Sequence, residues 1–136
     1  MITWNNLDTL EAFKNLSKAE RVNIAEAMSG ENGAERVKTY STPMAEGLAY
    51  NYAAKQVDDK LLEDLQKLAD EAQLTEKFEA LYNGEVINTG EKRMVLHHLT
   101  RGQLGEAVNA DGTDKRAFYK EQQQKIADFA NKVHAG

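Results

Sequence analysis

The strongest constraint on this fold is an amphipathic pattern that follows two adjacent aspartates, Asp58 and Asp59. Its apolar side chains recur at intervals of three or four residues, which places them along one face of a helix. Either aspartate can cap the first turn by accepting backbone N–H hydrogen bonds. We expect this face to lie in a buried core, and the alternative is a surface that binds a partner. The apolar positions are Leu61, Leu62, Leu65, Leu68, Ala69 and Ala72.

Shorter patterns of the same kind predict helices in most of the remaining chain. The capping box of Ser17 and Glu20 is expected to start one helix, which Gly30 ends before a loop that reaches Gly33. Asn83-Gly84 is a typical end for another. The predicted helices cover residues 7–16, 17–30, 58–72, 75–82 and 114–133.

One stretch of the chain favours β structure. Residues 37–41 are β-permissive, and residues 48–52 alternate Leu and Tyr with smaller side chains, so the two segments can pair as a hairpin around Pro43 and Gly47. The chain has 136 residues and is 41% hydrophobic, which is about the size of one domain. We therefore expect a mainly α fold, a compact domain over residues 1–136 with about five to six helices and a small β-hairpin.

Charge and composition exclude several classes of function. The net charge is -5, from 22 acidic and 17 basic side chains, which argues against nonspecific nucleic-acid binding. Without cysteine, the chain has no disulfide framework and no thiolate metal site. It carries no secretory signal, and no apolar stretch approaches the roughly 20 residues of a membrane span. These observations predict a soluble cytoplasmic protein that binds neither nucleic acid nor membrane.

The segment from residue 84 to residue 101 combines charged and apolar positions. Thr89 or Gly90 can begin a helix, and Glu91 would then lie in its first turn, where the helix dipole favours an anion. Arg93 and His97 are four residues apart and would form one row on this helix. The row could hold a carboxylate such as that of Glu85, as a structural clamp, or a sugar phosphate. We favour the clamp, because acidic side chains outnumber basic ones.

Other candidate sites are weaker. His97 and His98 are adjacent, whereas helical metal sites place their histidines four residues apart, so we expect no metal and instead one packed and one exposed histidine. Asp111-Gly112 is part of a sequence that resembles a calcium loop, but the first and last ligand positions hold Ala107 and Phe118. We therefore predict a tight turn there. No phosphate-binding glycine fingerprint, nucleophile elbow or catalytic carboxylate pair is present.

The segment Gly84–Arg101 resembles the G-E-x-I-N-x-T-E-x-R-x-V-L-H-x-x-x-R signature of glucose-6-phosphate isomerases. Residues 48–55, 65–69 and 111–112 also resemble segments of that family. The chain departs from the signature at Gly90, His98 and Thr100. The polar positions that match it, and to which we assign a structural role, are Glu85, Asn88, Glu91, Arg93, His97 and Arg101.

This resemblance implies an enzyme of glycolysis and gluconeogenesis that interconverts glucose 6-phosphate and fructose 6-phosphate as a homodimer, without a metal or organic cofactor. In such enzymes a glutamate moves a proton between C1 and C2 through an enediol. The catalytic and phosphate-binding residues of the family lie later than this chain extends, in α/β lobes that it lacks, so no catalytic residue is assigned. The chain is expected to be an amino-terminal structural domain that packs on those lobes and is inactive alone. The alternative is a free-standing, non-catalytic helical interaction module.

Overall fold

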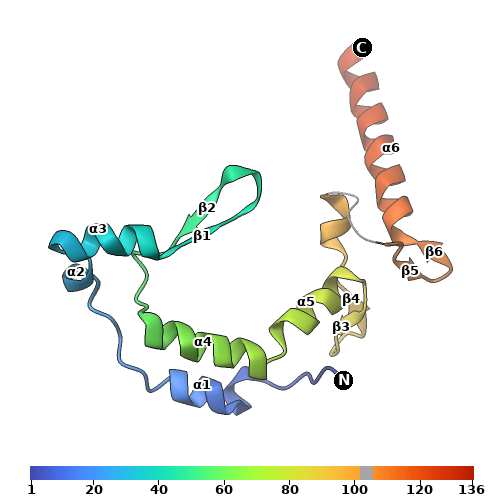
Figure 1. Ribbon diagram of the computed structural model, residues 1–136. Helices are drawn as coiled ribbons and strands as arrows, with labels where there is room; N and C mark the ends of the chain where they lie inside the picture. Colours follow the sequence, from blue (N-terminus) through green and yellow to red (C-terminus); the bar gives the residue numbers. More distant parts are fainter. Residues whose placement is uncertain (102–105) are drawn as a thin grey trace. The chain divides into compact units, whose positions relative to one another are not determined.

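A computed structural model describes residues 1–101 and 106–136 of the chain (Figure 1). The fold is mainly α, as the sequence predicts, and it has three small antiparallel two-stranded sheets among these residues. The chain divides into two compact units, Asn5–Ala72 and a second unit made of Met1–Trp4 and Gln73–Gly136. The single-domain organisation expected from the length stays a prediction.

The unit Asn5–Ala72 is built around the packing of α1 (Glu11–Leu16) on α4 (Asp59–Glu71). The carboxylate of Glu71 accepts hydrogen bonds from the backbone N–H groups of Glu11 at 3.1 Å and Ala12 at 2.7 Å. A negative charge at this point satisfies free donors and complements the helix dipole. The short helix α1 therefore depends on α4 for the cap at its amino terminus. The 3₁₀ turn η1 (Leu7–Thr9) precedes it.

The predicted amphipathic helix is confirmed as α4, and Asp58 is its cap. The side chain of Asp58 accepts a hydrogen bond from the backbone N–H of Leu61 at 2.7 Å. The expectation of a buried core face is wrong, because no residue of α4 is fully buried and Leu65 is 38% exposed. Packing on α1 covers only part of the apolar stripe.

Two expectations for the segment after α1 are wrong. Ser17 does not start a helix but ends α1, and its hydroxyl donates to the carbonyl of Lys14. The next helix, α2 (Ile24–Ala27), is a single turn capped by the side chain of Asn23. The predicted loop at Gly30 is the start of α3 (Gly30–Thr39). Gly33 lies against the carbonyl of Met28, where a Cβ atom would collide, so this glycine permits close packing and not a loop.

The predicted hairpin is confirmed, but its first strand lies later in the chain than the expected residues 37–41. β1 (Ser41–Pro43) pairs antiparallel with β2 (Ala49–Asn51), and Thr42 lies opposite Tyr50. The 3₁₀ turn η2 (Ala45–Gly47) connects them. Residues 37–39, expected in the first strand, instead complete α3.

The second unit begins with α5 (Leu74–Tyr82), which confirms the predicted helix and its end at Asn83. The helix predicted from Thr89 or Gly90 to Arg101 is wrong. Its residues form the hairpin of β3 (Val86–Asn88) and β4 (Arg93–Met94), followed by the 3₁₀ turn η3 (His97–Thr100). Asn88 explains the difference, because its side-chain oxygen accepts a hydrogen bond from the backbone N–H of Glu91 at 3.1 Å and closes a turn.

The unit ends with a second hairpin and a long helix. β5 (Asn109–Ala110) and β6 (Thr113–Asp114) flank Asp111 and Gly112, whose φ angles of 52° and 70° confirm the predicted tight turn. α6 (Lys115–Ala135) follows and confirms the predicted last helix, and its amino terminus is capped by Asp114. Among the described residues, no helix has the length and apolarity that crossing a membrane requires.

Candidate functional site

The six signature residues fall on three elements of the second unit. Asn88, Glu91 and Arg93 lie at the tip of the β3–β4 hairpin, and Glu85 precedes it. His97 begins η3, which Arg101 ends. All six side chains are classed as exposed. Arg93 and His97 therefore do not form a row on one helix, and the structural role assigned to these residues stays a prediction.

The hairpin tip is held by contacts among the signature residues themselves. Asn88 donates a side-chain hydrogen bond to the carboxylate of Glu91 at 3.3 Å, in addition to the backbone bond described above. Arg93 lies 3.9 Å from the same carboxylate. Both partners of that ion pair are largely exposed, so solvent screens the attraction and its contribution to stability is small. The tip is thus a self-contained polar turn.

The packed histidine of this region is His98. Its Nε2 donates to the carbonyl oxygen of Tyr82 at 3.0 Å, and its ring stacks on that of Tyr82 with 4.9 Å between centroids. His97 is exposed. The prediction of one packed and one exposed histidine is confirmed, although the sequence could not tell which was which.

Tyr82 is the centre of this packing. Phe78 stacks on its ring from the same helix, and the guanidinium of Arg116 lies 6.0 Å from the ring centroid. Arg116 is buried, and its Nε donates to the carbonyl of Glu106 at 2.8 Å. The ring thus connects α5, η3 and α6. The sequence does not single out Tyr82 or Arg116 as connecting residues, since neither stands in a recognisable motif.

Gly84 is the most constrained signature position. Its φ is +76°, which favours glycine, and a Cβ atom there would collide with the side chain of Val108. Val108 is buried, and its carbonyl accepts a hydrogen bond from the N–H of Lys115 at 2.7 Å. The glycine therefore lets the end of α5 contact the segment that leads into α6.

This arrangement fits a structural role better than a catalytic one. Within the described part of the chain, no three His, Asp or Glu side chains gather as a metal site. The buried cation near the signature, Arg116, already donates to a backbone carbonyl. Among the exposed cations of the signature segment, Arg93 lies near a carboxylate of its own turn. None of these contacts assembles the convergent donors that a sugar phosphate needs.

Comparison with known proteins assigns the family. The phosphoglucose isomerase family model matches residues 51–136. This range includes α4, α5, the signature segment and α6. The chain belongs to the phosphoglucose isomerase family.

Several proteins named glucose-6-phosphate isomerase match nearly the whole chain. The glucose-6-phosphate isomerase of Treponema denticola is 49% identical over 138 residues, which cover 98% of this chain and 26% of that protein. Those of Treponema pallidum strain Nichols and Borreliella afzelii are each 40% identical, covering 99% and 100% of this chain and 26% and 25% of the relatives. The chain thus spans about a quarter of the length of these relatives.

Proposed function

We propose that this chain is the amino-terminal structural part of a cytoplasmic glucose-6-phosphate isomerase and has no isomerase activity alone. The parent reaction interconverts glucose 6-phosphate and fructose 6-phosphate in glycolysis and gluconeogenesis. Its partners are the remaining α/β lobes of the enzyme, and the whole protein is a homodimer. The observation that carries the proposal is the 49% identity to an isomerase of which this chain covers only 26%.

The amount of exposed surface supports a dependence on further protein. The chain exposes 10613 Å². Two compact domains of half this mass would together expose about 8,600 Å² even when fully apart. Each taken by itself, the two units together therefore expose roughly 2,000 Å² more than two compact domains of their size. Surface in such excess is typical of elements that are completed by other parts of a protein.

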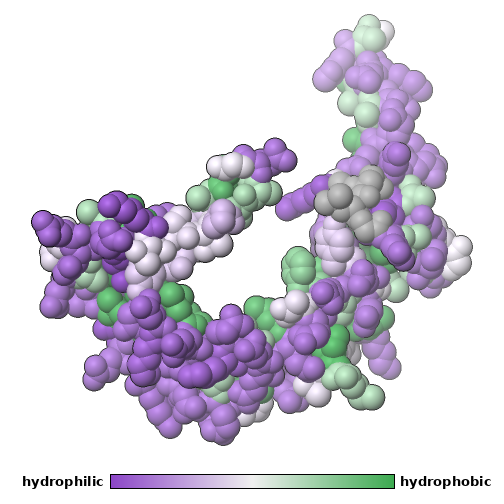
Figure 2. All heavy atoms as spheres, viewed as in Figure 1, coloured by the Kyte–Doolittle hydropathy of each residue, from purple (hydrophilic) through white to green (hydrophobic). Residues whose placement is uncertain are grey.

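Apolar side chains account for part of this exposure. On α6, Ile126, Phe129 and Val133 lie three and four residues apart and are 60–70% exposed. Apolar groups also reach the surface around the β1–β2 hairpin (Figure 2). An apolar helix face of this kind is usually buried against another element. It suits a helix that packs on a lobe of the same enzyme.

Activity measurements test the proposal. The 136-residue chain and the full isomerase polypeptide that carries it are purified separately and assayed with fructose 6-phosphate in a coupled assay. We expect turnover by the full polypeptide and none by the chain above a heat-treated control. Turnover that scales with the isolated chain would contradict its inactivity. A full polypeptide without turnover would instead favour the non-catalytic interaction module.

A further inference from the structure

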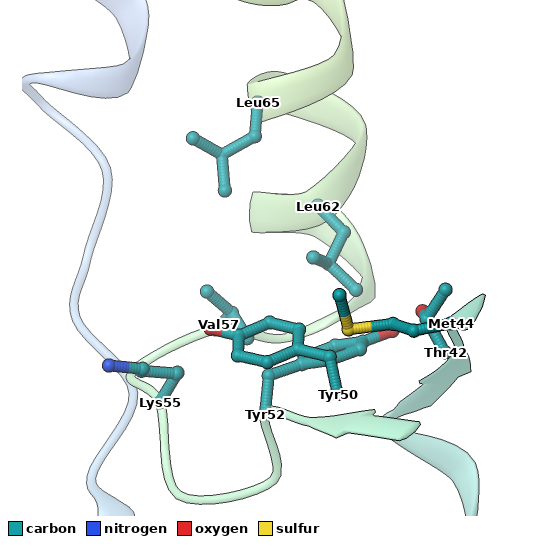
Figure 3. Close-up of a pocket in the computed structure, with 8 residues that line it drawn as sticks. All are labelled: Thr42, Met44, Tyr50, Tyr52, Lys55, Val57, Leu62 and Leu65. Carbon is teal, nitrogen blue, oxygen red and sulfur yellow. The ribbon is translucent and has the colours of Figure 1, made fainter. Parts of the chain in front are cut away.

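An apolar groove lies inside the unit Asn5–Ala72, between the β1–β2 hairpin and α4. Its volume is about 620 Å³. Tyr50 and Tyr52 form one wall, with their ring centroids 5.9 Å apart, and Leu62 and Leu65 of α4 point toward them (Figure 3). The other lining residues are Thr42, Met44, Lys55 and Val57.

The groove is held in shape by contacts behind its walls. Arg36 of α3 donates hydrogen bonds to the carbonyls of Ala53, at 2.7 Å, and Lys55, at 3.0 Å, and a third to Val57. Its guanidinium lies 4.2 Å from the ring centroid of Tyr40. One side chain thus fixes the segment that connects the hairpin to α4. Because these contacts already fix its shape, the groove can bind a partner segment without first being ordered.

Two further contacts complete this support. The hydroxyl of Tyr40 donates to the carboxylate of Asp59 at 2.8 Å, which joins the end of α3 to the start of α4. The Tyr40 ring also meets that of Tyr52 edge to face, with 5.4 Å between centroids. The aromatic wall of the groove is therefore anchored to both helices.

The chemistry of the groove suits apolar side chains of protein. Lys55 is the one charged residue among the eight that line it, and its amino group points away from the apolar side chains (Figure 3). Apart from Lys55 and the hydroxyls of Thr42, Tyr50 and Tyr52, the lining is apolar, so contacts made in the groove are mainly apolar. Met44 is 59% exposed and Tyr50 is 51% exposed, so the apolar lining is open to a further element.

We propose that the groove receives an apolar segment from the remaining part of the same isomerase polypeptide. This inference rests on the proposed function and names the surface through which the amino-terminal part is joined to the rest. The relatives are about four times as long as the chain, so they contain ample further protein to supply the segment. The unit itself has thirteen acidic and eight basic side chains, which disfavours an anionic membrane surface as the occupant.

Cysteine labelling tests whether the groove is covered. The chain has no native cysteine, so Met44→Cys introduces one reporter at the groove, and Lys38→Cys introduces a control on α3, where the lysine side chain is 75% exposed. Each variant is made in the 136-residue chain and in the full isomerase polypeptide. Maleimide labelling is followed at the peptide level by mass spectrometry, so thiols elsewhere in the full polypeptide do not interfere.

We expect the reporter at position 44 to label about tenfold more slowly in the full polypeptide than in the isolated chain, and the control at 38 to label equally in both. Equal labelling at position 44 would overturn the inference. Equal slowing at both positions would also overturn the inference, because it would show that the whole surface of the unit is less accessible and that the groove is not covered specifically.

A crosslinking measurement identifies the occupant. Tyr50→p-benzoylphenylalanine is introduced into the full polypeptide, and ¹⁴N and ¹⁵N forms are mixed, dissociated, reassembled and irradiated. Crosslinks within one isotope form, to a peptide beyond residue 136, support the proposal. Crosslinks between the two forms would show that a second copy occupies the groove and would overturn it.

The same preparations separate the two proposals. If the full polypeptide turns over fructose 6-phosphate while position 44 stays reactive, the groove inference fails and the proposed function stands. If the full polypeptide has no isomerase activity, the proposed function fails whatever the labelling shows.

Discussion

At the scale of single residues, the signature is explained by backbone geometry and packing more than by charge. Gly84 is the clearest case, because both its positive φ and the position of Val108 exclude a larger residue. Asn88 is another, since its side chain closes the turn of the β3–β4 hairpin. Both residues help to fix the path of the chain in this segment.

Substitution of Gly84 should be costly. An L-residue at this φ costs roughly 1 kcal/mol and the collision with Val108 a further 1–3 kcal/mol, so Gly84→Ala should lower the free energy of unfolding by about 2–4 kcal/mol. Gly112→Ala is the matched control, because Gly112 also has a positive φ but nothing lies near its Cβ position. Chemical denaturation measures both. An equal cost for the two variants would show that contact with Val108 is unimportant.

The two histidines should differ in their effect on stability. His98→Ala removes a ring stack and a hydrogen bond and should destabilise the chain by about 1–3 kcal/mol. His97→Ala removes an exposed side chain and should change stability by no more than about 0.5 kcal/mol. Thermal unfolding of the two variants checks the order. If His97→Ala were the more destabilising variant, His97 would be the structural residue, as the signature alone predicts.

At the scale of elements, the sequence predicted those whose signals are local and repeated. The apolar stripe and the Asp58 cap identify α4, Asn83-Gly84 identifies the end of α5, and Asp111-Gly112 identifies a turn. The prediction failed where one side chain redirects the backbone. The spacing of apolar residues after Thr89 is typical of a helix. The Asn88 side chain instead accepts a hydrogen bond from the backbone N–H of Glu91 and closes a turn there.

Contacts between residues that are far apart in the chain could not be predicted from the sequence either. Gly30 and Gly33 suggested a loop. Gly33 instead lies within α3, where the nearby carbonyl of Met28 leaves no room for a Cβ atom. The stacking of His98 on Tyr82 joins residues sixteen apart through no motif. The site residues could therefore be located by family resemblance, whereas the packing around them could not.

The contact between α3 and α4 should depend on pH. The hydrogen bond to Asp59 raises the pKa of Tyr40 above its usual value of 10.0, with burial as a further cause. The folded chain therefore retains this proton to higher pH than the unfolded chain does. Stability from this contact is fully present below pH 10.0 and falls as the pH rises through the raised pKa.

Removal of the Tyr40 hydroxyl should flatten this dependence. Tyr40→Phe should cost about 1 kcal/mol at neutral pH and show a smaller loss of stability above pH 10.0 than the parent chain. Asp59→Asn should also reduce the alkaline loss, because it replaces the carboxylate whose hydrogen bond and charge raise the pKa of Tyr40. Urea denaturation at a series of pH values gives the comparison. Parallel curves for parent and variants would contradict the account.

At the scale of the whole molecule, the chain has large exposed apolar surfaces and few buried residues. The buried apolar set among the described residues is Leu10, Ala53, Ala80, Leu99 and Val108. Two of these five are alanines, so burial alone contributes modestly to stability. The groove beside α4 and the apolar face of α6 are consistent with elements that are completed by other protein.

A chimera can test whether this chain serves as one part of an isomerase. The matching quarter of the Treponema denticola glucose-6-phosphate isomerase is replaced by residues 1–136, and the purified chimera is assayed with fructose 6-phosphate. We predict a folded chimera with isomerase turnover close to that of the parent enzyme, and no turnover by either part alone. A chimera that folds but does not turn over, or an isolated chain that does, would contradict the account.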